Sequence, residues 1–221
     1  MDDLVKTVRQ VLRENADSGL APGQQAYMKS SMPFLGVRVP EVRRLTKAAA
    51  RANPPTDLDQ LERAVRELWD GATHREERYA ATALTGLRLA SGRLELLPLY
   101  EHMAVTGAWW DHVDEVAHRI ADLHDAHPGP TALAVRGWAT SPDLWLRRLA
   151  ILSQLGRRDR VDRGLLTEVI EPNTEDPEFF IRKAIGWALR EVARVDPDWV
   201  RTFVEEHELS PLSRREALKH L

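Results

Sequence analysis

The sequence contains no cysteine, which excludes disulfide bonds, thiolate catalysis and thiolate metal sites. It also has no apolar run approaching the roughly 20 residues that a membrane-spanning helix needs. The opening residues, MDDLVKTVRQ, are acidic from the start and lack the long apolar core of a secretory signal. We therefore expect a cytoplasmic protein with no membrane segment.

An excess of positive charge is missing as well. The 221 residues include 31 Lys and Arg against 34 Asp and Glu, a formal net charge of −3. A protein that coats itself in nucleic acid is usually basic overall, so this composition leaves room only for a local basic face. The remainder is ordinary for a soluble globular protein, with 43% apolar and 29% charged residues, apart from 7 Trp against 3 Tyr and 4 Phe.

Strand signals are nearly absent, whereas helix starts recur. Four starts share one layout, a capping side chain followed by proline: Ser141-Pro142, Asp176-Pro177, Asp196-Pro197 and Ser210-Pro211. We expect each proline to be the first helical residue, because it has no N–H to leave unpaired there. Amphipathic segments predict helices over 3–15, 23–30, 40–52, 57–69, 74–89, 93–104, 109–125, 130–139, 142–155, 162–171, 177–194, 197–206 and 211–220.

A faint internal repeat indicates that these helices stack in pairs. Residues 142–148 (PDLWLRR) align with residues 177–183 (PEFFIRK) at an offset of 35 residues. A period of this length is typical of α-solenoids, and the lack of a TPR signature favours HEAT-like pairs. No long linker interrupts the chain. The predicted fold is therefore all-α, one domain over residues 1–221, an α-solenoid of HEAT-like antiparallel helix pairs curved around a concave binding cleft.

The helix expected over 177–194 carries cations and an aromatic ring on one face. Lys183, Trp187, Arg190 and Arg194 follow one another at helical spacing, apart from the apolar stripe of the same helix. Such a face suits a nucleic-acid backbone. The alternative is that Trp187 packs against a neighbouring repeat and the cations are only solvated. This helix alone favours that alternative.

Two further stretches point to chemistry. In the helix expected over 109–125, Trp110 and Asp114 lie one turn apart, an arrangement that stabilises a cation or orients a water. The alternative is an acid favoured by the helix dipole beside a partly buried ring. Segment 136–163 holds seven Arg against three Asp. That excess of four positive charges suits a wall that binds DNA, although a charge run more often marks a solvated face.

These stretches resemble the AlkD family of DNA alkylpurine glycosylases, which are HEAT-like α-solenoids. The most specific segments are 105–114, with the motif WWD-x-V-D, and 178–191, with FFI-x-KAIGW-x-LRE. Segments 145–151 and 209–220 are similar, and so are shorter matches at 27–29, 34–37 and 66–69. The resemblance therefore spans nearly the whole chain in order.

The resemblance implies roles for individual residues. Trp110 and Trp187 correspond to the tryptophans that the family places against the lesion-bearing deoxyribose, and Asp114 to its catalytic carboxylate. Arg148 corresponds to a cation beside the backbone at the lesion, and Tyr27 to a further aromatic residue near the site. Weaker correspondences imply contacts with the DNA backbone for Lys29, Arg43, Lys47, Lys183, Arg190, Arg214, Arg215 and Lys219.

The resemblance also implies the activity. It is hydrolysis of the N-glycosidic bond of cationic N3- or N7-alkylated purines in duplex DNA, for base excision repair. Trp and Asp would stabilise an oxocarbenium-like sugar, without a deep base-flipping pocket. No lysine lies beside these residues for a Schiff base, so we expect a monofunctional hydrolase. We expect no metal or other cofactor, and a monomer in the cytoplasm that associates with the nucleoid when bound to DNA.

Two other functions compete with this one. A non-catalytic HEAT-like solenoid would bind DNA structures or a protein partner. It has no need of a carboxylate at Asp114, which repels phosphate. Metal-dependent hydrolysis would draw on His112, His118, His124 and His127, yet only His118 shares the face of Asp114 and no HExxH motif occurs.

Overall fold

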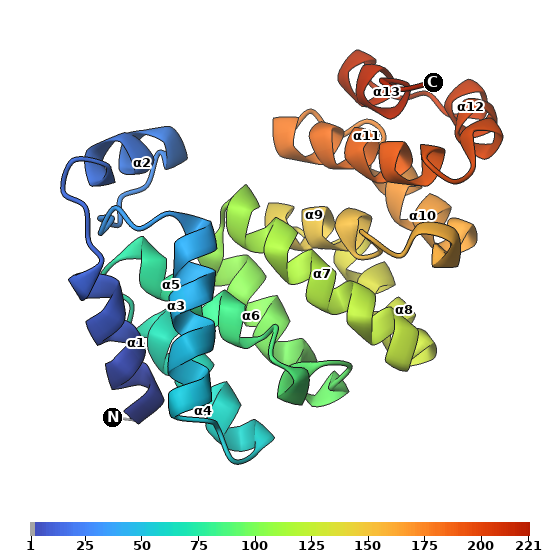
Figure 1. The fold of residues 1–221 in the computed structure, drawn as a ribbon. Coiled ribbons are helices and arrows are strands. Elements are labelled where there is room, and N and C mark those ends of the chain that lie inside the picture. The colour runs from blue at the N-terminus through green and yellow to red at the C-terminus, as the bar shows by residue number, and fades with distance from the viewer. Residues whose placement is uncertain (1–2) are drawn as a thin grey trace. The chain divides into compact units, whose positions relative to one another are not determined.

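The computed structural model describes residues 3–221, and every regular element within them is a helix. Figure 1 shows these helices and the short loops that join them. The chain divides into two compact units, the first ending at Ser91 and the second beginning at Gly92. The all-helical class is confirmed, while a single domain over the whole chain stays a prediction.

The first unit is built around α5. Its helices are α1 (Asp3–Glu14), α2 (Ala21–Met28), α3 (Val39–Ala52), α4 (Leu58–Asp70) and α5 (Arg75–Leu84), followed by the 3-10 turn η1 (Arg88–Ala90). Both α3 and α4 pack on α5, and α1 packs on α3. The fully buried Glu76 on α5 accepts backbone N–H groups of Leu35, Gly36 and Val37 at 2.8–3.1 Å. This carboxylate therefore fixes the loop that leads into α3.

The second unit contains eight α-helices, which pack largely against their neighbours in sequence. They are α6 (Leu97–Gly107), α7 (Trp110–Ala126), α8 (Pro128–Ala139), α9 (Leu144–Leu152), α10 (Arg163–Ile170), α11 (Phe179–Ala193), α12 (Pro197–Glu206) and α13 (Pro211–Ala217), with 3-10 turns η2 (Leu94–Leu96), η3 (Arg158–Arg160) and η4 (Glu171–Asn173). Helix α6 packs on α7 and α8 on α9, both α7 and α11 contact α9, and α13 lies along α11. The predicted apolar stripes of α7 and α11 are buried.

The helix spacing matches the repeat found in the sequence. Helices α5, α7, α9 and α11 begin at Arg75, Trp110, Leu144 and Phe179, so consecutive members start 34 or 35 residues apart. Asp114, Arg148 and Lys183 are consequently each the fifth residue of their helix. The predicted period is confirmed, and it brings chemically different residues to equivalent positions of successive helices.

The expectation that proline begins each helix is right for two of the four starts. Asp196 and Ser210 cap α12 and α13, which begin at the following proline. The other two are wrong, because α9 begins at Leu144 and α11 at Phe179. At α9 the capping oxygen belongs to Asp143, which accepts from the backbone N–H groups of residues 145 and 146. At α9 the proline is thus left in the turn before the helix.

Among the other helices, two differ most from their expected boundaries. The helix expected over 74–89 ends at Leu84, and residues 88–90 form a separate 3-10 turn. The Thr85 hydroxyl donates to the Thr82 carbonyl at 2.7 Å, an oxygen that a continuing helix would offer to the N–H of Gly86. The helix expected over 93–104 begins instead at Leu97 and runs to Gly107.

Candidate functional site

Three aromatic side chains meet where α7, α9 and α11 begin. Trp109 immediately precedes α7, Trp145 lies in the first turn of α9, and Phe180 lies in the first turn of α11. The ring centroid of Trp109 is 6.0 Å from that of Trp145 and 5.4 Å from that of Phe180, and Trp145 and Phe180 are 5.1 Å apart. We call these three residues the aromatic cluster. Phe179 extends it outward, since its ring is 5.4 Å from Phe180 and 52% of the residue is exposed.

A bidentate ion pair lies beside the aromatic cluster. Arg148 on α9 donates from Nε to Oδ1 of Asp114 at 2.8 Å and from Nη2 to Oδ2 at 2.9 Å. Its Nη1 donates to the backbone carbonyl of Phe180 at 2.6 Å. The side chains of Arg148 and Asp114 are only 4% and 15% exposed. Helices α7, α9 and α11 are thus tied together through one guanidinium, which holds the carboxylate in a fixed orientation.

Two opposing influences set the protonation of Asp114. Burial is the larger one and raises the pKa of this carboxyl above its ordinary value. The hydrogen bonds and positive charge of Arg148 act in the other direction and lower the same pKa. Arg148 is therefore what favours the charged form of an acid in a poorly solvated place.

Of the two tryptophans expected at the site, Trp110 lies on the helix of Asp114, and Trp187 lies on α11, where Arg148 contacts the backbone carbonyl of Phe180. Trp110 is the first residue of α7, half-buried and one turn before Asp114 on the same face. Trp187 is half-buried on α11, two turns beyond Phe180 on the face that Phe180 shares. The helix register is thus compatible with both rings facing the region of Asp114, and their roles stay predictions.

The two cations that flank Trp187 already have an anionic partner. Lys183 Nζ lies 2.7 Å from Oε1 of Glu216, and Arg190 Nη1 lies 2.6 Å from Oε2 of the same carboxylate. The Lys183 hydrogen bond is the main cause that lowers the pKa of Glu216 to about 2, with a further contribution from Arg190. Glu216 on α13 is thus an anion that neither periodicity nor motif pointed to.

The other predicted DNA-contact residues are mostly exposed. In the second unit Arg214 donates to the backbone carbonyl of Val204 at 3.0 Å, while Arg215 and Lys219 are exposed. The first unit holds Tyr27, which is 76% exposed, Lys29, and the pair Arg43 and Lys47 on one exposed face of α3. The structure leaves the DNA contacts of these residues as predictions.

The basic segment 136–163 has much less free charge than its sequence suggests. Six of its seven arginines form ion pairs: Arg136 with Glu168, Arg147 with Asp176, Arg148 with Asp114, Arg157 and Arg160 with Asp125, and Arg163 with Asp196. All five of these acids lie outside residues 136–163. The local excess of positive charge is therefore largely offset by the fold.

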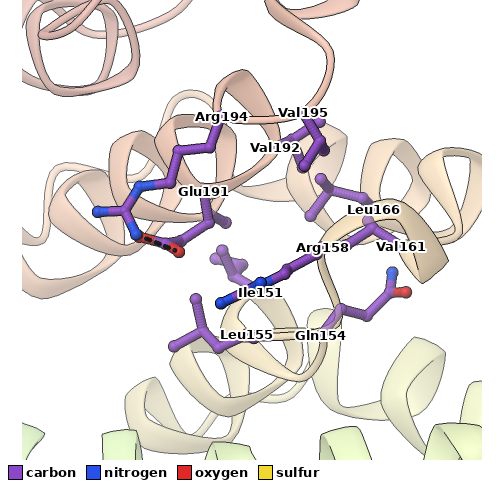
Figure 2. A pocket seen from close by; sticks show the side chains of 12 residues that line it. Ile151, Gln154, Leu155, Arg158, Val161, Leu166, Glu191, Val192, Arg194 and Val195 are labelled. Atoms are coloured by element: carbon purple, nitrogen blue, oxygen red, sulfur yellow. Dashed lines mark hydrogen bonds and ion pairs between the residues drawn. The ribbon is translucent and has the colours of Figure 1, made fainter.

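A separate cavity of about 350 Å³ lies between α9, η3, α10 and α11. Figure 2 shows its lining, with the ion pair between Arg194 and Glu191 on one side. The floor is apolar and includes Ile151 and Leu155. None of its lining residues belongs to the aromatic cluster or to the Asp114–Arg148 pair. The cavity is therefore distinct from the site.

The histidines are dispersed rather than gathered. Burial lowers the pKa of His124 to about 4, and its Nε2 lies 3.3 Å from the Ser153 hydroxyl. His127 contacts the carbonyl of Gly92, and His118 is exposed. Within residues 3–221 no group of three or more His, Asp or Glu side chains is arranged to hold a metal ion. The same residues contain no helix long and apolar enough to cross a membrane.

Sequence reasoning assigned no role in the site to three contributors to this region. Trp109 and Phe180 belong to the aromatic cluster, and Glu216 holds the two cations of α11. The repeat offered a signal for Phe180, because Trp145 and Phe180 are both the second residue of their helix. For Glu216 no local signal existed, since its partners lie on another helix.

A family model and one solved structure point to the same family. The model of the DNA alkylation repair enzyme family matches residues 8–221. Among solved structures, a protein from Enterococcus faecalis described as a predicted DNA alkylation repair enzyme matches with a TM-score of 0.84 and 29% identity, over 93% of this chain and 96% of that one. The protein smu.31 from Streptococcus mutans UA159 matches with a TM-score of 0.63 at 19% identity, over 83% of this chain and 92% of that one, which is a likeness of fold. No curated protein matches the sequence.

Proposed function

The chain belongs to the DNA alkylation repair enzyme family, and from that premise we propose that it is a monofunctional DNA glycosylase. Its substrates would be cationic N3- or N7-alkylated purines in duplex DNA, whose N-glycosidic bond it hydrolyses for base excision repair. The observation that carries the proposal is the Asp114–Arg148 ion pair beside the aromatic cluster. A buried carboxylate held by two hydrogen bonds is suited to meet a positive charge that develops on a sugar.

The proposed reaction breaks the bond between C1′ of the deoxyribose and the ring nitrogen of the alkylated base. The electron pair of that bond leaves with the base and neutralises its positive charge, so little protonation of the base is needed. The sugar passes through an oxocarbenium-like state, which water resolves by adding its oxygen to C1′. A proton of that water passes to solvent, with Asp114 orienting the water and offering a transient acceptor.

The half-buried rings of Trp110 and Trp187 would support the same charge. The face of an indole ring attracts a cation, and both rings lie on helices whose ends carry the aromatic cluster. We propose that they contact the deoxyribose at the lesion. Tyr27, exposed in the first unit, would add an aromatic contact to the same DNA.

Binding of the duplex would rest on exposed cations. The exposed cations are Lys29, Arg43, Lys47, Arg214, Arg215 and Lys219. Of these, Arg214 also donates a hydrogen bond to the backbone carbonyl of Val204. Arg148 is buried and would act through Asp114 rather than through a phosphate. Lys183 and Arg190 would contribute only where Glu216 releases them. The regular spacing of helix starts supports HEAT-like pairs that work as one DNA-binding domain. We also propose that the protein acts as a monomer in the cytoplasm.

The test is release of free base from duplex DNA that carries a single cationic N7-alkylguanine. We expect release by the wild type and a loss of about 10²-fold or more for Asp114→Asn, because the developing charge loses its carboxylate. Asp122→Asn is the matched control, since it removes the same charge from the same helix at a side chain that is 44% exposed. Binding of the duplex by Asp114→Asn should persist, and thermal unfolding should show that the variant is folded.

If Asp114→Asn released the free base as fast as the wild type, the proposed chemistry would be wrong. Tight binding without release by any variant would favour the non-catalytic solenoid, with Trp110 and Trp187 as a recognition surface. Release only in the presence of an added divalent metal would favour metal-dependent hydrolysis.

A further inference from the structure

Glu216 holds two cations on one face of α11. Its two carboxylate oxygens each take one partner, Lys183 Nζ at 2.7 Å and Arg190 Nη1 at 2.6 Å. The side chain of Glu216 is only 11% exposed, whereas that of Lys183 is 39% exposed and that of Arg190 is 17% exposed. Trp187 lies between the two cations in sequence, one turn from Lys183. The carboxylate thus occupies the surface that sequence periodicity indicated for a nucleic-acid backbone.

The carboxylate cannot easily withdraw, because α13 is docked closely on α11. A Cβ atom at Gly186 would lie 2.4 Å from Cβ of Glu216 and 2.8 Å from the carbonyl oxygen of Ser213. The Ser213 hydroxyl donates to the carbonyl of Arg182 at 2.9 Å. Arg190 also donates to the backbone carbonyl of Glu216 at 3.2 Å. These contacts hold the backbone of Glu216 close to α11, so its carboxylate stays near Lys183 and Arg190.

The chemistry of this arrangement resembles that of a bound phosphate. A carboxylate and a phosphate both present paired oxygens to lysine and arginine, and both form charge-assisted hydrogen bonds with them. A DNA phosphate that approached Lys183 or Arg190 would have to compete with an anion already in place. It would also meet the negative charge of that anion.

We propose that Glu216 is a specificity-determining residue that acts as an internal stand-in for a DNA phosphate. It keeps Lys183 and Arg190 from binding the backbone of undamaged duplex, and so lowers the affinity for DNA that carries no lesion. This inference rests on the proposed DNA-binding function. The inference adds that Lys183 and Arg190, two of the cations expected to bind DNA, are held by Glu216 instead.

The measurement is the salt dependence of binding to an undamaged duplex. Each phosphate neutralised on B-form DNA contributes about 0.9 to the slope of log K against log salt. Glu216→Gln removes the charge and keeps the shape, so we expect a slope steeper by about one to two units. Between 50 and 200 mM salt this amounts to an extra fall in affinity of about four- to sixteenfold. Excision by Glu216→Gln should be inhibited by correspondingly lower concentrations of undamaged competitor DNA.

Two variants separate this effect from general ones. Glu168→Gln removes one carboxylate from another ion pair, with Arg136, and we expect its slope to match that of the wild type. Glu216→Asp keeps the charge and should also keep the wild-type slope. An equal change in Glu168→Gln would mean that only the net charge matters, which would overturn the inference.

Lys183→Gln tests the same idea without removing the carboxylate. If Glu216 withholds Lys183, this variant binds undamaged duplex with an unchanged slope. A slope that falls by about 0.9 would mean that Lys183 binds a phosphate directly and would contradict the inference. An unchanged slope for Glu216→Gln together with reduced thermal stability would give Glu216 a structural role alone.

Failure of the proposed function is distinguishable from these outcomes. A wild type that neither binds duplex DNA nor releases alkylated base would overturn the proposed function. A wild type that does both, with an unchanged slope in Glu216→Gln, would overturn only the assignment of Glu216.

Discussion

Asp114 combines a buried position with a charge that the proposed chemistry requires. Burial raises its pKa, so its negative charge is lost at a higher pH than that of an ordinary aspartate as the solution is acidified. The two hydrogen bonds from Arg148 oppose that loss. At the scale of single residues, the proposed activity would thus depend on a basic side chain that has no need to touch DNA.

This arrangement predicts a pH effect for Arg148→Gln. Without the guanidinium the pKa of Asp114 rises further, so the carboxylate becomes protonated at higher pH. The acid limb of the excision rate should therefore move toward neutral pH, measured under single-turnover conditions across the pH range where the protein stays folded. Arg147→Gln is the matched control, because Arg147 is adjacent on α9 and pairs with Asp176 instead. An acid limb that stays where it is in the wild type would exclude Arg148 as the group that holds Asp114 ionised.

At the scale of helices, the α11–α13 contact depends on a missing side chain. Gly186 lies where a methyl group would meet Glu216 and Ser213 at less than 3.0 Å. A glycine inside a helix is normally unfavourable relative to alanine, so its presence here is explained by close packing.

Gly186→Ala should therefore destabilise the protein by about 1–3 kcal/mol, since the new methyl group overpacks a tight interface. Gly137→Ala on α8 is the control, because nothing lies within 4 Å of the added Cβ. It should be neutral or stabilising by about 0.5–1 kcal/mol. Denaturant unfolding of the two variants beside the wild type measures both effects. Equal stability of the two variants would mean that α13 shifts to make room.

At the scale of the whole molecule, the net charge of −3 does not reveal how many of the cations form ion pairs. Six of the seven arginines in segment 136–163 form ion pairs with acids outside the segment, and Lys183 and Arg190 form ion pairs with Glu216. The charge that remains for DNA is carried by a few exposed residues.

We accordingly expect a modest salt dependence for the wild type. The slope of log K against log salt should correspond to no more than about six phosphates, one for each exposed cation proposed to bind DNA, or to about −5 or a shallower value, measured by salt titration of duplex binding. A slope of about −6 or steeper would show that ion pairs of segment 136–163 open when DNA binds.

The sequence by itself determined the helices and their period. Apolar residues at helical spacing predicted the buried stripes of α7 and α11. The repeat predicted an offset of 35 residues, and the helices begin 34 or 35 residues apart. The sequence also brought Trp110 and Asp114 to one face of α7. These are local properties, because neighbours along a helix are set by 3.6 residues per turn.

Only the tertiary structure decided which charges are free. Asp114 meets Arg148 across 34 residues of sequence, and Arg190 meets Glu216 across 26. It also decided that Asp143, rather than Ser141, caps α9. The energy of an ion pair depends on the distance between two groups and on their exposure to water, and neither follows from spacing along the chain. The sequence thus named the charged residues of the candidate site other than Glu216, and the packing of α7, α9, α11 and α13 determined which of them are held in pairs.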